Sequence, residues 1–174
     1  MKKLLTALFL GLVTLNSAQA QQAPDFQNMP LAQIEAEAAS LHPAALYVLA
    51  SRLFAEGKQQ EAANWMYAGQ LRYRFMIAAQ GDAASDERVL FSALTEQVAR
   101  PINEYIGGDP DEWIAAMQWA LEWDAATENA VTSKTEHAAT LAEIRQGLGK
   151  LITQVDTSRE EIREQRTANG LENR

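Results

Sequence analysis

Residues 43–75, with the sequence PAALYVLASRLFAEGKQQEAANWMYAGQLRYRF, decide the fold of this chain. Pro43 suits the first helical position and His42 can cap it, so a helix is predicted to begin here and to stop at Gly57. A second helix follows and fades near Gln80. Apolar and small residues recur at three- and four-residue spacings along both segments, which is typical of helices that bury one face. The stretch therefore predicts two helices joined by a short turn.

The segment from Leu46 to Gly69 resembles one unit of the tetratricopeptide or Sel1-like helical repeats. The positions that match the large, small and turn residues of the repeat are Leu49, Ala50, Leu53, Gly57, Ala62, Met66 and Gly69. Small residues let the two helices approach, and large ones fill the remaining space. The likeness covers residues 43–76, but Leu46 replaces the usual aromatic and the proline expected near Arg74 is absent. It implies a helical hairpin that binds protein or peptide on a concave surface, without catalysis.

The rest of the mature chain also predicts helices, because no stretch alternates with a period of two. Further helices are expected from Pro30 to about Ser40, from Ser85 to Gly107 with a kink at Pro101, from Pro110 to about Asp124, and from Ser133 to Asn169. Asp109 can cap one of these helices, with Glu112 closing a capping box, and Ser133 with Glu136 offers a second box. The expected fold class is all-α, a bundle of about six helices with a TPR-like hairpin.

The last long helix carries a narrow apolar stripe. Its members are Leu141, Ile144, Leu148, Leu151, Val155 and Ile162, and the stripe skips a step at Ser158. Such a stripe can pack inside a bundle or against a second copy of the chain, which would make a homo-oligomer. Thr157 or Ser158 can instead restart the helix after a break.

The first twenty residues predict where the protein works. Lys2 and Lys3 precede an apolar run that is too short to span a bilayer, and Ala18-Gln19-Ala20 supplies the small residues of a cleavage site. The expected organisation is a cleaved signal peptide over residues 1–20, an extended lead over 21–29, a single all-α domain over 30–170 and a tail over 171–174. The mature protein is therefore expected in the periplasm or outside a bacterial cell, with no stable membrane anchor.

Composition limits the partners and cofactors. The chain carries 15 Lys and Arg against 23 Asp and Glu, so removal of the two signal lysines leaves 13 basic residues and a net charge of −10. This balance argues against nucleic acid and allows a basic protein partner. The chain has no cysteine, which excludes disulfides, thiolate zinc sites and cysteine nucleophiles. No cofactor is expected.

Two groups of residues are candidates for partner binding. Trp113, Trp119 and Trp123 crowd one helix among acidic neighbours, which favours a peptide- or sugar-binding surface, with a packed core as the alternative. Arg72, Tyr73 and Arg74 form a cationic spot that can grip a carboxylate, such as a peptide C-terminus. Since residues two apart on a helix diverge by about 200°, an ion pair from an arginine to a neighbouring helix is the alternative.

Metal binding and catalysis have weaker signals. His42 and His137 have no partner at metal-ligand spacing, so no metal site is expected. Glu104 is the best candidate for the catalytic glutamate of a cell-wall hydrolase, and Asp109 and Glu112 are the next candidates. Glutamates are abundant in this chain, however, and no nucleophile elbow or nucleotide-binding motif is present. No catalytic residue is assigned.

The sequence therefore predicts an exported, non-enzymatic helical protein that binds another envelope protein. It would act either as a scaffold or assembly factor, or as an immunity protein that neutralises a toxin. The alternative is a cell-wall-active enzyme or glycan-binding protein that uses a glutamate and the tryptophan-rich helix.

Overall fold

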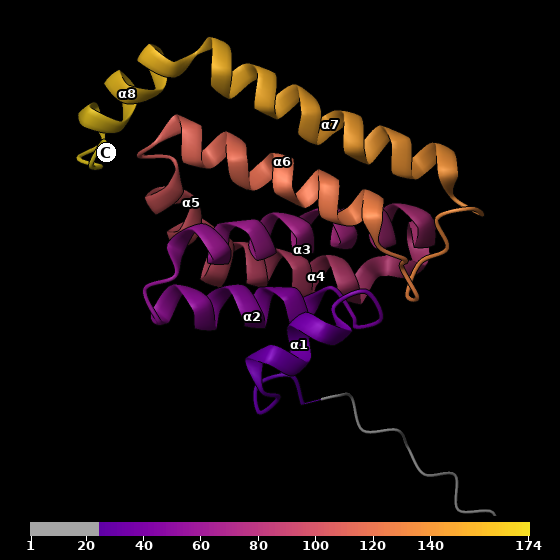
Figure 1. Cartoon of the computed structure of the whole chain (residues 1–174). Helices are drawn as coiled ribbons and strands as arrows, with labels where there is room; N and C mark the ends of the chain where they lie inside the picture. Colours follow the sequence, from indigo (N-terminus) through magenta and orange to yellow (C-terminus); the bar gives the residue numbers. More distant parts are fainter. Residues whose placement is uncertain (1–24) are drawn as a thin grey trace, which may run out of the picture.

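A computed structural model describes residues 25–174, and these residues fold into helices and connecting turns without any strand (Figure 1). The predicted signal peptide, and residues 21–24 of the lead, lie outside the described residues. The helices are α1 (Leu31–Glu37), α2 (Ala44–Ala55), α3 (Gln59–Gln80), α4 (Ser85–Leu94), α5 (Arg100–Ile106), α6 (Pro110–Ala126), α7 (Ala138–Thr157) and α8 (Arg159–Ala168). A 3₁₀ turn (Gly81–Ala84) and a π turn (Thr95–Ala99) flank α4. Helices α4 and α5 form one interrupted helix, and so do α7 and α8. Counted this way the bundle has six helices, so the prediction of an all-α bundle of about six helices is confirmed.

Helices α2 and α3 form the predicted hairpin. The N–H of Ala44 donates to Nδ1 of His42 at 3.2 Å, so this histidine caps α2 as expected. Gly57 has a φ of +78° and ends the helix. Its N–H donates to the carbonyl of Phe54, while that of Lys58 donates to the carbonyl of Leu53, which is the paired arrangement that satisfies the last carbonyls of a helix.

Helices α2 and α3 approach each other closely at Gly69 of α3, which has no side chain. A Cβ at Gly69 would lie 3.1 Å from Cβ of Leu46 and 3.1 Å from Cδ2 of Tyr47, so only glycine fits without a shift. Ala50 and Ala62 are both fully buried, as expected for positions where two helices touch.

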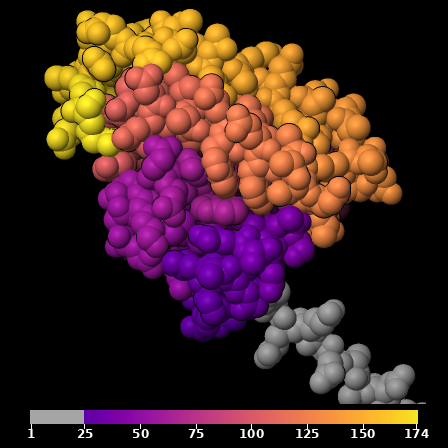
Figure 2. Space-filling view, in the orientation of Figure 1, coloured from indigo at the N-terminus to yellow at the C-terminus, as the bar shows by residue number. Residues whose placement is uncertain are grey.

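Helix α3 lies at the centre of the bundle. It packs against α2 on one side and α6 on the other, and it also contacts α5 and α7. Figure 1 shows α7 as the outermost long helix, lying along α6, with α8 beyond its end. Figure 2 shows the residues after α8, in yellow, against the start of α6. The apolar stripe of α7 thus faces α6 and α3, with Leu141 and Val155 buried and Ile144, Leu148 and Leu151 half-buried.

Both interrupted helices break for a local reason. Pro101 has no N–H to donate and its ring clashes with the carbonyl four residues back, and the preceding residues take the wider π turn in which Arg100 donates to the carbonyl of Thr95. Ser158 leaves helical geometry with φ −113° and ψ 23°, which is the break foreseen between α7 and α8. Gly170 closes α8 as predicted, with a φ of +72°.

The two predicted capping boxes form only in part. Oδ1 of Asp109 accepts from the N–H groups of residues 111 and 112, so it caps α6, but the carboxylate of Glu112 binds Arg174 instead of closing a box. Oγ of Ser133 accepts from the N–H of Glu136 in a separate turn, and α7 starts later, at Ala138. Within residues 25–174, no helix is long and apolar enough to cross a membrane.

Candidate functional site

Arg72 lies inside the protein. Its side chain is 1% exposed, and Nε lies 3.2 Å from Oδ1 of Asp124. Nη2 donates to Oγ1 of Thr127 and to the carbonyl of Glu128, both at 2.8 Å. The guanidinium carbon also lies 4.2 Å from the ring centre of Trp123. The ion pair to a neighbouring helix, the alternative reading of the arginines, is therefore confirmed for Arg72.

Asp124 collects three cations. Arg145 donates from Nε and Nη2 to Oδ2 of Asp124 at 2.9 and 2.6 Å, and Nζ of Lys134 lies 3.5 Å from Oδ1. Nζ of Lys134 also donates to the backbone carbonyls of Asp124 and Thr127. Burial lowers the pKa of Lys134, and the nearby Asp124 charge opposes that change. This network joins α3, α6, α7 and the loop between the last two.

The sequence interpretation missed the role of Asp124. A signal was present, because Met117, Ala120 and Asp124 follow one another at helical spacing on the buried face of α6. A carboxylate on a core-facing stripe requires a buried cation, and Arg72 was the cation that needed a partner.

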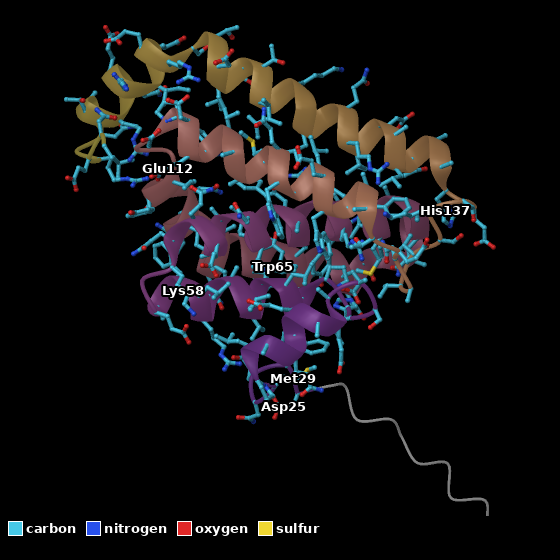
Figure 3. The ribbon with its side chains drawn as sticks, viewed as in Figure 1. Asp25, Met29, Lys58, Trp65, Glu112 and His137 are labelled. Atoms are coloured by element: carbon cyan, nitrogen blue, oxygen red, sulfur yellow. The ribbon has the colours of Figure 1, made fainter. Side chains whose placement is uncertain are left out.

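The tryptophans divide into two groups. Trp119 and Trp123 stack with ring centres 6.2 Å apart and planes 9° apart. Trp65 of α3 meets both edge-on at 5.0 and 5.3 Å, and Figure 3 shows it on α3, near the middle of the molecule. Trp113 lies apart, donating from Nε1 to the hydroxyl of Tyr67. All four are half-buried, so the candidate tryptophans pack within the bundle and do not form one open aromatic surface.

Tyr73 is buried and Arg74 is exposed, although both lie next to the ring of Phe91. Tyr73 is fully buried, and its hydroxyl donates to Oε2 of Glu87 at 2.6 Å. Burial, and then the bond to this carboxylate, raise the pKa of Tyr73 well above its usual range. Nε2 of His42 lies 3.4 Å from the same oxygen. Arg74 is exposed, and its guanidinium carbon lies 5.6 Å from the ring centre of Phe91.

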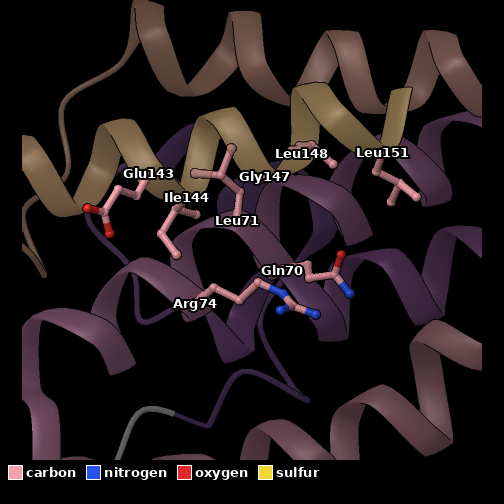
Figure 4. Close-up of a pocket in the computed structure, with 8 residues that line it drawn as sticks. All are labelled: Gln70, Leu71, Arg74, Glu143, Ile144, Gly147, Leu148 and Leu151. Atoms are coloured by element: carbon pink, nitrogen blue, oxygen red, sulfur yellow. The ribbon is translucent and has the colours of Figure 1, made fainter. Parts of the chain in front are cut away.

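A groove between α3 and α7 begins beside Arg74 (Figure 4). It has a volume of about 270 Å³ and is lined by Gln70, Leu71, Arg74, Glu143, Ile144, Gly147, Leu148 and Leu151. Most of its exposed wall is apolar, with Arg74 and Gln70 on the α3 side and Glu143 at one end. An apolar wall with a few polar groups at its rim is the usual composition of a binding site.

Two features keep this groove open and charged. Gly147 faces it without a side chain, and a Cβ added there would meet nothing within 4 Å. Arg74 takes part in none of the ion pairs formed within residues 25–174. The groove thus offers apolar surface next to a guanidinium that lies near the Phe91 ring and forms no ion pair within residues 25–174, and this combination is the candidate functional site.

The candidate catalytic acids are engaged elsewhere. Glu104 is exposed and lies 3.5 Å from Arg100 of its own helix. Asp109 caps α6, and the carboxylate of Glu112 lies 2.6 Å from Nη2 of Arg174. Glu112 also lines a polar cleft of about 400 Å³, together with Gly57, Lys58, Gln59, Gln60, Glu61 and Tyr105. Glu104 belongs to neither this cleft nor the groove.

The two histidines lie in separate places. His42 caps α2, whereas the ring of His137 packs edge-on against Phe75 at 6.4 Å. Figure 3 shows His137 at the far end of the molecule from Glu112. Within the described residues, no three His, Asp or Glu side chains gather as ligands for a metal ion.

Compared with protein-family models, with curated proteins and with solved structures, the chain matched none of them. The resemblance to tetratricopeptide and Sel1-like repeats stays a prediction that rests on the residues of the α2–α3 hairpin. Function is therefore inferred from the sequence and the geometry of the chain.

Proposed function

We propose that this is an exported, non-enzymatic helical protein that binds another envelope protein through the groove between α3 and α7. Two roles fit this proposal, a scaffold or assembly factor and an immunity protein that neutralises a toxin. The observation that carries it is the apolar groove next to Arg74, whose guanidinium has no ion-pair partner within residues 25–174.

The chemistry of the groove favours a peptide segment as its occupant. Leu71, Ile144 and Leu148 provide apolar surface for a large aliphatic or aromatic side chain of the partner. Arg74 is placed to hold a carboxylate of the same segment with two N–H donors. A helical or extended peptide with one large apolar side chain and a nearby acidic group would bind both the apolar surface and Arg74.

Charge bears on the rest of the partner. The net charge of −10 that remains after removal of a signal peptide attracts a protein that is basic overall and speeds its association. Small size, a predicted signal peptide and strong acidity are the properties that favour the immunity role over the scaffold role.

The proposal is tested by tagging the protein, expressing it in its native host and identifying what co-purifies from the envelope. Gly147→Leu fills the groove and should remove the partner from the eluate. Gly149→Leu is the matched control, because this glycine lies on the same helix, also has nothing within 4 Å, and does not line the groove. A near-stoichiometric partner that survives Gly149→Leu and is lost with Gly147→Leu is the expected result.

The identity of that partner separates the two roles. A toxin whose action is blocked by the protein indicates immunity, and a structural envelope component indicates a scaffold. Retention of the partner by Gly147→Leu overturns the groove as the binding site. If nothing co-purifies and the pure protein hydrolyses cell wall in a manner lost with Glu104→Gln, the alternative of a wall-active enzyme takes its place.

A further inference from the structure

Arg174 occupies a site built from Tyr105 and Glu112. Its guanidinium carbon lies 3.9 Å from the centre of the Tyr105 ring. Nη1 donates to the hydroxyl of Tyr105 at 3.0 Å, and Nη2 donates to Oε2 of Glu112 at 2.6 Å. A ring face, a phenol oxygen and a carboxylate together meet the requirements of a planar cation with a fork of donors.

The turn between α5 and α6 has space for the arriving segment. The backbone N–H of Arg174 donates to the carbonyl of Gly108 at 2.8 Å. A Cβ at Gly108 would lie 3.0 Å from the carbonyl oxygen of Glu172, and one at Gly107 would lie 3.1 Å from Nη1 of Arg166. The two glycines therefore leave room that residues 166–174 occupy.

Arg166 adds a second guanidinium at the same turn. Its Nη2 donates to the carbonyl of Glu104, near the C-terminal end of α5, and to the carbonyl of Glu172. Carbonyls at the end of a helix carry partial negative charge and favour a cation. The region from residue 104 to residue 112, here called the α5–α6 corner, thus accepts two arginine side chains.

The segment that supplies these arginines is held mainly by polar contacts. Helix α8 has no buried residue, and its apolar contact with the core is made by the half-buried Ile162. Its other link to the start of α6 is the ion pair of Arg159 with Asp111 at 2.8 Å, in which the Asp111 side chain is 81% exposed. Exposed ion pairs contribute little to stability. The break at Ser158 separates this segment from α7.

The two side chains that contact the Arg174 guanidinium are also accessible from another direction. Tyr105 and Glu112 also line the polar cleft beside the α2–α3 turn. An incoming side chain can therefore approach them from the cleft while Arg174 is in place.

We propose that the α5–α6 corner is a binding site for an arginine side chain of a basic protein partner, and that Arg174 occupies it until the partner displaces it. The ligand class is a solvent-exposed, arginine-bearing segment, which complements both the site and the net negative charge of the chain. The proposal rests on the proposed protein-binding function but uses a surface distinct from the groove between α3 and α7.

The test measures binding of a fluorescein-labelled tetra-arginine peptide to the full-length mature protein by fluorescence anisotropy. Arg174→Ala should bind the peptide about tenfold more tightly than the natural sequence, because the site no longer holds its own guanidinium. Adding Glu112→Gln should remove that gain, whereas Glu122→Gln, which removes an exposed charge elsewhere on α6, should not. A tetra-lysine peptide should bind more weakly, since an ammonium group lacks the planar fork.

Equal binding by the natural protein and by Arg174→Ala would overturn the proposal, as would equal effects of Glu112→Gln and Glu122→Gln. If Arg174→Ala loses helical content by circular dichroism, Arg174→Lys serves in its place and should still bind the peptide more tightly than the natural sequence. Capture of a partner through the groove, without arginine-dependent peptide binding at the corner, overturns this inference alone. Glu112-dependent peptide binding without any captured partner leaves the corner standing and counts against the proposed function.

Discussion

Nε of Arg72 lies 3.2 Å from Oδ1 of Asp124, and the two side chains are 1% and 0% exposed. Each residue comes from a different helix, and 52 positions separate them in the chain. A buried carboxylate needs its cations more than an exposed one does, because water cannot replace them. The pair therefore joins α3 to α6 at a point where neither charge tolerates the loss of the other.

Removal of the carboxylate should strongly destabilise the protein. Asp124→Ala leaves Arg72 buried without its counter-charge and frees Arg145, so the free energy of unfolding should fall by about 3–5 kcal/mol. Urea unfolding followed by circular dichroism measures the change. Asp156→Ala is the control, because this exposed carboxylate pairs with Arg159 and should cost less than about 1 kcal/mol. Similar losses in the two variants would contradict the role given to the buried pair.

Two glycines should respond to alanine in opposite directions. Gly69→Ala places a Cβ 3.1 Å from Leu46 and Tyr47, so it should lower the free energy of unfolding by about 1–3 kcal/mol through overpacking. Gly147→Ala adds a Cβ in open space within α7, so it should raise that free energy by about 0.5–1 kcal/mol through helix propensity. Thermal unfolding of both variants provides the comparison. A stabilising effect of Gly69→Ala would show that α2 and α3 lie farther apart than described.

The buried tyrosines should make the fold sensitive to alkali. Burial raises the pKa of Tyr67 from 10.0 to about 12, so folding favours the neutral phenol. The resulting stability is complete below pH 10 and is lost as the pH rises from 10 to 12, by an amount on the order of 2–3 kcal/mol. Denaturant unfolding at pH 9, 10, 11 and 12 should show this fall. Burial also raises the pKa values of Tyr47 and Tyr73, so Tyr67→Phe should make the fall shallower without abolishing it. An unchanged slope in that variant would assign the fall to other groups.

The side-chain cap of α6 by Asp109 should contribute to the free energy of unfolding independently of the buried ion pair. Oδ1 of Asp109 accepts from the N–H of Asp111 at 2.8 Å and from that of Glu112 at 3.3 Å. Asp109→Ala should therefore cost about 0.5–2 kcal/mol, and Asp109→Asn, which keeps an acceptor, should cost less. Urea midpoints of the two variants decide the point, and a larger loss for asparagine than for alanine would exclude capping as the cause.

The fold class could be predicted from the sequence because its signals are local. Pro43, Gly57 and Gly170 act on the backbone within one turn of the residues they end or start, and the structure places helix boundaries beside each of them. Ser133 misled for a physical reason: its hydroxyl caps a turn, and Lys134 is drawn into the network around Asp124 before α7 begins.

The sites were less predictable because they depend on distant pairs. Arg72 and Arg74 were both candidates, yet only the position of α6 decides that the first lies inside and the second lies at a groove. Glu112 was expected to close a capping box, but it meets Arg174, which arrives from 62 positions later. Spacing along one helix gives the direction of a side chain and not the identity of its neighbour.

The π turn at Thr95–Ala99 also sets how far α5 is rotated about the common helix axis relative to α4. One extra residue in a helical turn rotates the next segment by about 100° about its axis. Deleting one residue from this turn would straighten the interrupted helix into regular α geometry but turn α5 away from α3. Asn103 would then leave the hydroxyl of Tyr67, from which it accepts at 2.8 Å. An irregularity of one residue therefore keeps two halves of an interrupted helix facing the same core.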